Sequence, residues 1–401
     1  MKYLLIIVVV VFIIFGNGIG GDFVYDDHLV VELNARLHES GVFFKQLVLP
    51  YHYQQPESGL YRPLTMMSFI VNFWLGDGPI GFHIVNILIH AANVFLLYVI
   101  LERLFHRRTI SLIAAGLFLV LPIHVEAISA ISGRPDLLAT LFALISVYAC
   151  IKQKYAWSAI ALLFALFSKE SAVGIVFALA YLIFVFQKKT FREAVRSCIW
   201  YVGAGLIYAC LRYVALKEYF LGIDVSFVYN PLKFVDPFTR VLSAIKIGGM
   251  YLWKSVVPIH LSADYSYNQI PLASWKDAMP VALAFLVFAS LLGIIFWRRT
   301  RNSIYAFGSV FLLGTFLVVS NFIVPIGTIM AERTFYLPSV GLIVILAALV
   351  AYAMESKWRK SMLAFMVIIG IAYGARTMAR NTVWHDRETL FTDMAATASQ
   401  S

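Results

Sequence analysis

Runs of apolar residues long enough to cross a lipid bilayer recur from one end of this chain to the other. One of them reads "GFHIVNILIHAANVFLLYVIL" and begins at Gly81. A transmembrane helix needs about 20 such residues. Hydrophobic residues make up 61% of the chain and charged residues only 13%, whereas soluble domains carry about 25% charged residues. Because β-barrels in membranes consist of short alternating strands instead, the sequence predicts an all-α polytopic membrane protein.

The apolar runs predict about eleven transmembrane helices, with the N-terminus cytoplasmic and the C-terminus extracytoplasmic. The expected spans are residues 3–19, 80–101, 109–127, 136–151, 155–168, 172–187, 197–216, 279–297, 304–323, 336–354 and 361–376. The first run also resembles a signal peptide, so cleavage near "GNGIGG" is an alternative interpretation. Either interpretation leaves the topology of the remaining spans unchanged.

The distribution of basic residues supports this topology. The net charge is +10, and the lysines and arginines cluster in connections between spans, in "RLFHRR", "KQK", "QKKTFREAVR", "RRTR" and "KWRK". Such clusters are typical of cytoplasmic loops, and they do not form the basic face of a nucleic-acid-binding protein. The three cysteines, Cys150, Cys198 and Cys210, have neither metal-binding nor redox spacing and are expected to serve packing.

Two extracytoplasmic segments are long, and each is expected to contain a helix at the outer interface, at residues 63–75 and 240–262. The second of these carries Lys246 and Lys254 at helical spacing, which favours an amphipathic or re-entrant helix over a span. The predicted organisation is therefore a first span at 1–19, a loop at 20–79, transmembrane helices at 80–216, a second loop at 217–278, transmembrane helices at 279–376 and an extracytoplasmic tail at 377–401.

Charged residues gather at the extracytoplasmic ends of the predicted spans, although charges near hydrocarbon are costly. They are Asp26, Asp27, Arg62, His124, Glu126, Arg134, Asp136, Lys169, Glu170, Asp264, Glu332 and Arg333. Because all of them fall on the same membrane face, we expect them to converge in one cavity.

Simpler interpretations exist for several of these residues. The sequences "SKE" and "SGRPD" are also typical of turns with helix caps, and Glu332 and Arg333 could each form an architectural ion pair. His124 and Glu126 could hold a metal ion, but no third ligand is identified. For the adjacent pair Asp26 and Asp27, mutual repulsion near the interface favours a functional role over a loop turn.

Carboxylates and fixed cations on one outer face indicate a site for an anionic lipid headgroup beside a base. Arginine and lysine near the interface suit a phosphate, and a carboxylate suits deprotonation of an acceptor hydroxyl. The pattern lacks the ring of similar groups that a channel needs and the internal repeat of many secondary transporters.

The ordered motifs resemble those of the transmembrane and tetratricopeptide-repeat O-mannosyltransferases and their prokaryotic relatives, and more distantly the protein O-mannosyltransferases of the GT-C fold. The motifs are "YDD", "YRPLT", "GFHIVNILIHAANVFLLY", "IHVEAISAISGRPDLLATLF", "SKESA", "ADYSYNQIP", "AERTFYLPSVG" and "RNTVWHDRETLF". The resemblance covers nearly the whole chain. It implies a GT-C glycosyltransferase that moves a sugar, with inversion, from a polyprenyl- or dolichyl-phosphate donor to a hydroxyl, for example of protein Ser or Thr, on the extracytoplasmic side.

The resemblance also implies roles for individual residues. Asp26 would be the catalytic base, and Asp27 would position the acceptor or support Asp26. The candidate ligands of the donor phosphate are Arg62, Lys169, Arg333 and Arg134, and the supporting polar cluster comprises His124, Glu126, Asp136, Glu170, Asp264 and Glu332.

The sequence departs from the family pattern in two places. Leu121 stands where relatives commonly have the first histidine of His-Pro-x-His, which weakens a metal role for His124; no metal ligand is assigned, and assistance by a divalent metal stays open. No tetratricopeptide repeats follow "RNTVWHDRETLF", so we expect a separate acceptor-binding partner. The short chain favours a bacterial or archaeal cytoplasmic membrane, with the endoplasmic reticulum as the alternative.

Two other functions compete with the glycosyltransferase. A flippase or transporter of lipid-linked sugars would also need a phosphate site, and a polar path to the cytoplasmic face would favour it; Arg212 is the main intramembrane candidate for such a path. A non-catalytic membrane scaffold predicts that Asp26→Asn and Asp27→Asn affect stability alone.

Overall fold

The computed structural model of the chain describes residues 2–39, 41–52, 55–76, 78–222, 225–297, 299–300 and 303–398, and within them it contains helices but no strands. The α-helices are α1 (Lys2–Phe15), α2 (Val42–Lys45), α3 (Pro63–Leu75), α4 (Pro79–Phe105), α5 (Arg108–Val120), α6 (Val125–Ser129), α7 (Arg134–Ile151), α8 (Tyr155–Ser168), α9 (Ile175–Tyr181), α10 (Phe191–Leu216), α11 (Pro237–Val256), α12 (Ala278–Phe296), α13 (Ile304–Val319), α14 (Tyr336–Met354), α15 (Arg359–Asn381) and α16 (Arg387–Thr397). The predicted all-α class is confirmed.

Six helical segments of the described chain are long and apolar enough to cross a membrane: Pro79–Phe105, Ile131–Ile151, Phe191–Tyr219, Trp275–Phe296, Glu332–Met354 and Arg359–Trp384. A seventh is formed if Arg108–Val120 and Pro122–Ser129, which meet at a bend of 53°, make one broken span. The predicted spans at 3–19, 155–168, 172–187 and 304–323 lie on shorter apolar helices. The polytopic architecture is thus confirmed, and the number eleven stays a prediction.

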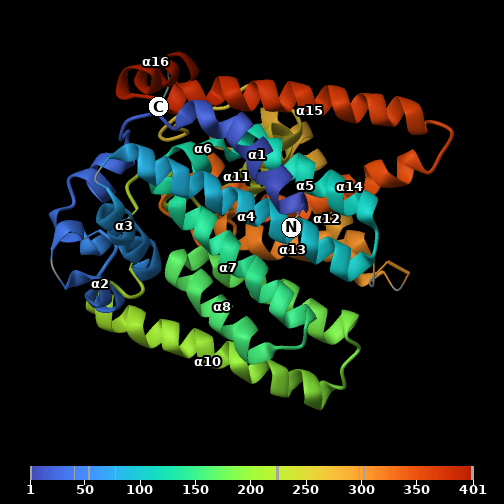
Figure 1. Cartoon of the computed structure of the whole chain (residues 1–401), viewed down its shortest axis with the longest axis horizontal. Helices are drawn as coiled ribbons and strands as arrows, with labels where there is room; N and C mark the ends of the chain where they lie inside the picture. Colours follow the sequence, from blue (N-terminus) through green and yellow to red (C-terminus); the bar gives the residue numbers. More distant parts are fainter. Residues whose placement is uncertain are drawn as a thin grey trace.

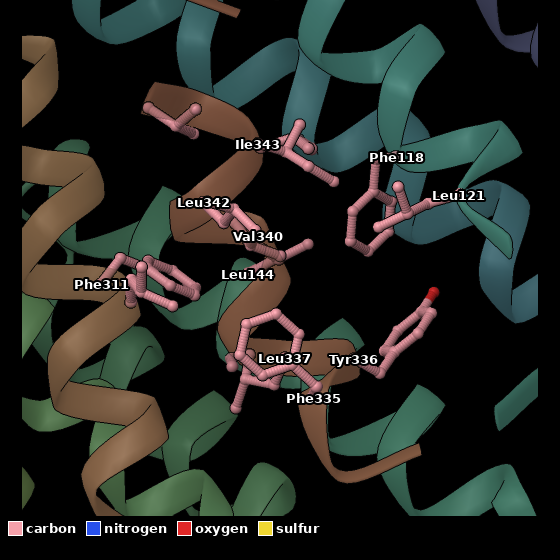
Figure 2. Close-up of a cluster of buried hydrophobic side chains, with 14 of the residues drawn as sticks. Phe118, Leu121, Leu144, Phe311, Phe335, Tyr336, Leu337, Val340, Leu342 and Ile343 are labelled. Atoms are coloured by element: carbon pink, nitrogen blue, oxygen red, sulfur yellow. The ribbon is translucent and has the colours of Figure 1, made fainter. Parts of the chain in front are cut away.

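Helix α14 lies in the centre of the bundle. Figure 2 shows its side chains Tyr336, Leu337, Val340 and Ile343, with Phe335 of the preceding turn, facing Phe118 and Leu121 near the end of α5, Leu144 of α7 and Phe311 of α13. A Cβ at Gly341 would lie 2.4 Å from the backbone nitrogen of Leu312, so this glycine permits α13 and α14 to touch through their backbones, as small residues do between membrane helices. In contrast, only 11% of the most apolar stretch of each of the helices α10, α12 and α15 is buried inside the protein. Such exposure suits helices that face lipid.

The two ends of the bundle differ in character. Helices α2, α3, α6 and α16 gather toward the left of Figure 1, and the connections α9–α10 and α14–α15, which carry basic clusters, lie toward the right. We call these the site end and the basic end. Arg298 and Arg301 of the "RRTR" cluster lie outside the described residues. Which end faces the cytoplasm stays a prediction.

The described part of the 20–79 loop folds against its own apolar cluster, in which Val31, Leu37 and Tyr51 pack with Phe69 of α3 and Phe82 of α4. Helix α3 occupies the predicted range 63–75, begins with Pro63 and ends before Gly76, as expected for a proline in the first turn. Helix α11 begins at Pro237 after the N-cap Asp236 and buries Ala244, Ile247 and Tyr251 on one face. A helix in this region is confirmed, but it ends at Val256, before Pro258, and not at the predicted residue 262.

Candidate functional site

Arg333 joins two carboxylates that lie more than 200 residues away from it in the sequence. Its Nη2 donates to Oδ2 of Asp26 at 3.0 Å, and its Nε lies 3.4 Å from Oε1 of Glu126. Its backbone N–H donates to the second oxygen of Glu126 at 2.9 Å. Because Glu126 belongs to α6 and Arg333 to the 3-10 turn before α14, the site is built where these two turns meet the 20–79 loop.

Asp26 and Asp27 are adjacent in sequence but face different surroundings. The backbone turns at Tyr25, whose φ is 52°. The Asp27 side chain is fully buried and accepts from the backbone N–H groups of Ser132 at 2.6 Å and of Val24 and Ile131 at 3.2 Å. In contrast, the Asp26 side chain is 40% exposed. The two carboxylates therefore have different partners: Asp27 binds backbone N–H groups, and Asp26 forms an ion pair with Arg333.

Burial raises the pKa of Asp27 to about 6, and the hydrogen bonds from Ser132, Val24 and Ile131 only partly offset that effect.

Two of the three cations predicted alongside Arg333, Arg62 and Lys169, are each bound to a carboxylate. Arg62 makes a bidentate ion pair with Glu170, with Nε–Oε2 and Nη2–Oε1 distances of 3.0 and 2.6 Å. Lys169 Nζ lies 2.7 Å from both oxygens of Asp136. Burial lowers the pKa of Lys169, Asp136 opposes this shift, and Arg62 and Arg333 add to it. The three cations are therefore electrostatic neighbours.

Two residues of this site, Tyr51 and His52, escaped the sequence analysis. The guanidinium of Arg62 lies 5.0 Å from the centroid of the Tyr51 ring, and the Tyr51 and His52 rings are 4.9 Å apart. Arg36 holds this segment by donating to the carbonyls of Pro50 and Tyr51 at 3.1 and 3.2 Å. The sequence feature that could have identified them is the aromatic and histidine cluster "PYHY", which lies in the same loop as Asp26 and Arg62.

Burial lowers the pKa of His52 to about 4, and the nearby cation Arg62 lowers it further while Asp26 opposes this. The imidazole is therefore neutral near pH 7. Burial likewise raises the pKa of Tyr51 to about 12, whereas Arg62 and Arg333 act against that shift. The site thus places a neutral imidazole and a neutral phenol beside Asp26 and Arg62.

Arg134 and His124 are enclosed by structural contacts. The fully buried Arg134 donates to the side-chain oxygens of Asn86 at 2.8 Å and Asn72 at 2.6 Å, and to the carbonyls of Phe82 and Ser68. The ring nitrogens of His124 contact the Phe118 carbonyl at 3.1 Å and the Ser339 hydroxyl at 2.8 Å. Within the described ranges, no group of three His, Cys, Asp or Glu side chains could hold a metal ion.

Glu332 and Asp264 lie beside the group formed by Arg333, Asp26 and Glu126, and their carboxylates bind other partners. Oε1 of the buried Glu332 accepts from the Tyr265 hydroxyl at 2.5 Å and from the Ser262 N–H at 2.8 Å. The carboxylate of Asp264 accepts from the backbone N–H and hydroxyl of Ser266 at 2.9 and 2.8 Å. Burial raises the pKa of Tyr25, and Asp26 and Asp264 add to that rise, so Asp264 faces the same region as Asp26.

Comparisons with known proteins bear on this arrangement. The family described as "Dolichyl-phosphate-mannose-protein mannosyltransferase" matches residues 66–214, from α3 to α10. The chain is 28% identical over 456 residues to human "Protein O-mannosyl-transferase TMTC4", covering 95% of this chain and 60% of the relative. It is 28% identical over 435 residues to TMTC3 of Mus musculus, covering 97% and 47%, and 26% identical over 475 residues to tmtc2 of Xenopus laevis, covering 94% and 56%.

The resemblance predicted from the ordered motifs is confirmed by these matches. The chain spans about half to three-fifths of the length of these curated relatives. Nearly all of this chain is covered in each comparison, including Asp26 and Arg333, which lie outside the range of the family match.

Proposed function

We propose, with this similarity as the premise, that the chain is an integral membrane glycosyltransferase that uses a lipid-phosphate sugar donor. The donor is a polyprenyl- or dolichyl-phosphate-linked hexose, mannose or a similar sugar, and the acceptor is a hydroxyl of a protein Ser or Thr. The reaction takes place at the site end, which we propose to be extracytoplasmic. A bacterial or archaeal cytoplasmic membrane is the proposed location.

The main support for this proposal is the environment of the Asp26 carboxylate, that is, its hydrogen-bond partner and its exposure. One of its oxygens is held by Arg333 at 3.0 Å, and the other has no hydrogen-bond partner among the described residues. With its side chain 40% exposed, Asp26 is oriented and still accessible to an incoming hydroxyl. This is the geometry that a general base requires, since it must lie within hydrogen-bond reach of the proton it removes.

In the proposed reaction, Asp26 accepts the proton of the acceptor hydroxyl while the hydroxyl oxygen attacks the anomeric carbon of the donor sugar. A glycosidic C–O bond forms, the bond between the anomeric carbon and the phosphate oxygen breaks, and its electron pair leaves with the lipid phosphate. Attack from the face opposite the phosphate inverts the configuration at the anomeric carbon.

Arg62, Lys169 and Arg333 are the proposed ligands of the leaving phosphate. Nη1 of Arg62 has no hydrogen-bond partner among the described residues, so this guanidinium can bind a phosphate oxygen while it keeps Glu170. In this proposal Glu170, Asp136 and Glu126 orient the three cations. The contacts of Arg134 and Asp27 favour structural roles, with Asp27 supporting the turn beside Asp26.

The test is a transfer assay with purified protein in detergent or nanodiscs. Radiolabelled polyprenyl-phosphate mannose or glucose and Ser/Thr peptides are supplied to the wild type and to Asp26→Asn. We expect transfer by the wild type and a loss of about 10²- to 10⁴-fold in Asp26→Asn, which is the usual contribution of a general base.

Asp22→Asn is the matched control, because Asp22 is an exposed carboxylate of the same loop and should keep wild-type transfer. Equal transfer by Asp26→Asn and the wild type would overturn the role of Asp26. If the protein moves the labelled donor across a vesicle membrane but transfers no sugar, the chain is a flippase rather than a transferase.

A further inference from the structure

A pocket of about 250 Å³ opens at the basic end, between the start of α8 and one face of α10. It is lined by Tyr155, Lys189, Glu193, Arg196, Ser197 and Trp200. Residues 193, 196, 197 and 200 have the spacing i, i+3, i+4 and i+7, so they lie on one side of α10. The pocket is therefore a groove along the helix flank, and its lining shares no residue with the site around Asp26 and Arg333.

Two cations, Lys189 and Arg196, face this pocket with one carboxylate, Glu193, which interacts electrostatically with both, so the lining keeps a net positive charge. Lys189 Nζ lies 4.3 Å from the centroid of the Tyr155 ring and 3.4 Å from the Ser197 hydroxyl. The Arg196 guanidinium has no hydrogen-bond or ion-pair partner within the described parts of the chain. The carboxylate of Glu193 is already bound at the start of α10, where Oε2 accepts from the N–H and hydroxyl of Thr190 at 3.0 and 2.8 Å.

Two aromatic side chains line the pocket: Tyr155 is held in place by hydrogen bonds, and Trp200 adds apolar surface. The Tyr155 hydroxyl donates to Oε1 of Gln187 at 2.6 Å, and Gln187 in turn donates to the carbonyl of Cys150 at 2.8 Å. Trp200 is 54% exposed beside the apolar flank of α10, of which only 11% is buried. A tryptophan near lysine and arginine in the first turns of a helix with an exposed apolar flank is typical of the membrane interface.

We propose that this pocket binds the phosphate of an anionic phospholipid headgroup, with Lys189 and Arg196 on the phosphate oxygens and the acyl chains along α10. Free inorganic phosphate shares the headgroup chemistry, but it would leave the apolar flank unused. Basic pockets between membrane helices bind anionic headgroups in this way. The proposal is independent of the transferase activity.

The test measures lipid retention by native mass spectrometry of detergent-purified protein titrated with phosphatidylglycerol or phosphatidylcholine. The variant carries Lys189→Gln and Arg196→Gln. The control carries Arg359→Gln and Lys360→Gln, which remove two charges from exposed residues of α15 at the same end. We expect the wild type and the control to retain phosphatidylglycerol over phosphatidylcholine, and the pocket variant to bind it roughly tenfold or more weakly.

Equal weakening in the pocket variant and the control would overturn the proposal, because it would indicate a general charge attraction. Unchanged retention by the pocket variant would overturn it as well. In a further arm, a thermal shift with inorganic phosphate as large as that with phosphatidylglycerol would overturn the lipid as the source. Size-exclusion profiles verify folding, and Arg196→Gln alone replaces the double variant if that one aggregates.

Discussion

At the scale of single residues, the site separates two neighbouring carboxylates by function. The turn at Tyr25 sends Asp27 into the protein, where three backbone N–H groups surround it, and leaves Asp26 partly exposed beside Arg333. A buried carboxylate with three donors anchors backbone, whereas a half-exposed one can exchange a proton with a ligand. Substitution should therefore affect the two residues in different ways.

Asp27→Asn should destabilise the protein by about 1–3 kcal/mol, the penalty for unsatisfied buried polar groups. Both Asp27 oxygens accept from backbone N–H groups, so the amide nitrogen of an asparagine must face one of these donors. Asp26→Asn should cost about 1 kcal/mol or less, because its ion pair is partly exposed. Thermal unfolding in detergent, followed by tryptophan fluorescence, compares the two. Equal losses of stability in the two variants would contradict a structural role for Asp27 and a chemical role for Asp26.

His52 should make the stability of the fold depend on pH. Its pKa falls from 6.5 in the unfolded chain to about 4 in the folded protein, so the unfolded chain binds the proton more readily between these values. Stability is therefore lost as the pH falls from about 6.5 toward 4, by as much as about 3 kcal/mol. His52→Gln should make this decline shallower. Unfolding temperatures between pH 4 and 7 measure the effect.

Asp27 changes the stability with pH in the direction opposite to His52. The His52→Gln variant must therefore be compared with the wild type at each pH. Its pKa rises from 3.8 to about 6 on folding, so the folded protein binds this proton more readily, and stability falls as the pH rises through that window. His260→Gln, at an exposed histidine, is the matched control and should reproduce the wild-type profile. A His52→Gln profile parallel to the wild type would contradict the prediction.

At the scale of elements, the short turns between helices align the site. The segment from α6 to the start of α7 carries Glu126, Ser132 and Arg134, and it is compact because Gly133 packs against the backbone of Ala127. A Cβ at Gly133 would lie 2.4 Å from the Ala127 carbonyl oxygen and 2.8 Å from its carbonyl carbon. The turn can therefore keep its shape only with glycine at this position.

Gly133→Ala should lower stability by about 1–3 kcal/mol, as overpacking does, and should also reduce sugar transfer, because the displaced turn holds both Glu126 and the N–H groups that bind Asp27. Thermal unfolding and the transfer assay measure the two effects. Gly116→Ala in α5 is the control, since nothing lies within 4 Å of its added Cβ and alanine favours a helix. A Gly133→Ala protein as stable and active as this control would contradict the argument.

The sequence predicts elements better than it predicts contacts. Helix α3 is predicted at 63–75, because Pro63 suits a first turn, and the observed bounds agree. The charged residues of the site are also predictable, because charges near hydrocarbon are unusual. Their pairing is not, since Arg62–Glu170 joins residues 108 positions apart and depends on how α3 packs near α8. Tyr51 and His52 escaped because aromatic residues in a loop carry no periodic signal.

At the scale of the whole molecule, the two ends of the described chain meet beside the site. The side chain of Asn381, at the end of α15, donates to the carbonyl of Ile14 and to Oδ1 of Asn17, both at 2.9 Å. The backbone N–H of Asp22 donates to the carbonyl of His385 at 2.8 Å. Because Asp26 lies four residues after Asp22, the position of the proposed base depends on contacts with the last helices of the chain.

Asn381→Ala should therefore weaken both stability and transfer. The Asn381 side chain is fully buried and also accepts from the Ser129 hydroxyl at 3.2 Å, so its loss leaves the Ile14 carbonyl and the Ser129 hydroxyl without this partner, at about 1–3 kcal/mol. Thr382→Ala is the control, because among the described residues this exposed hydroxyl donates only to the carbonyl of Ala379 in the preceding turn. Hydrogen exchange should show faster exchange at residues 15–27 in Asn381→Ala but not in the control. Unchanged exchange there, with reduced transfer, would mean that Asn381 acts by another route than the N-terminal segment.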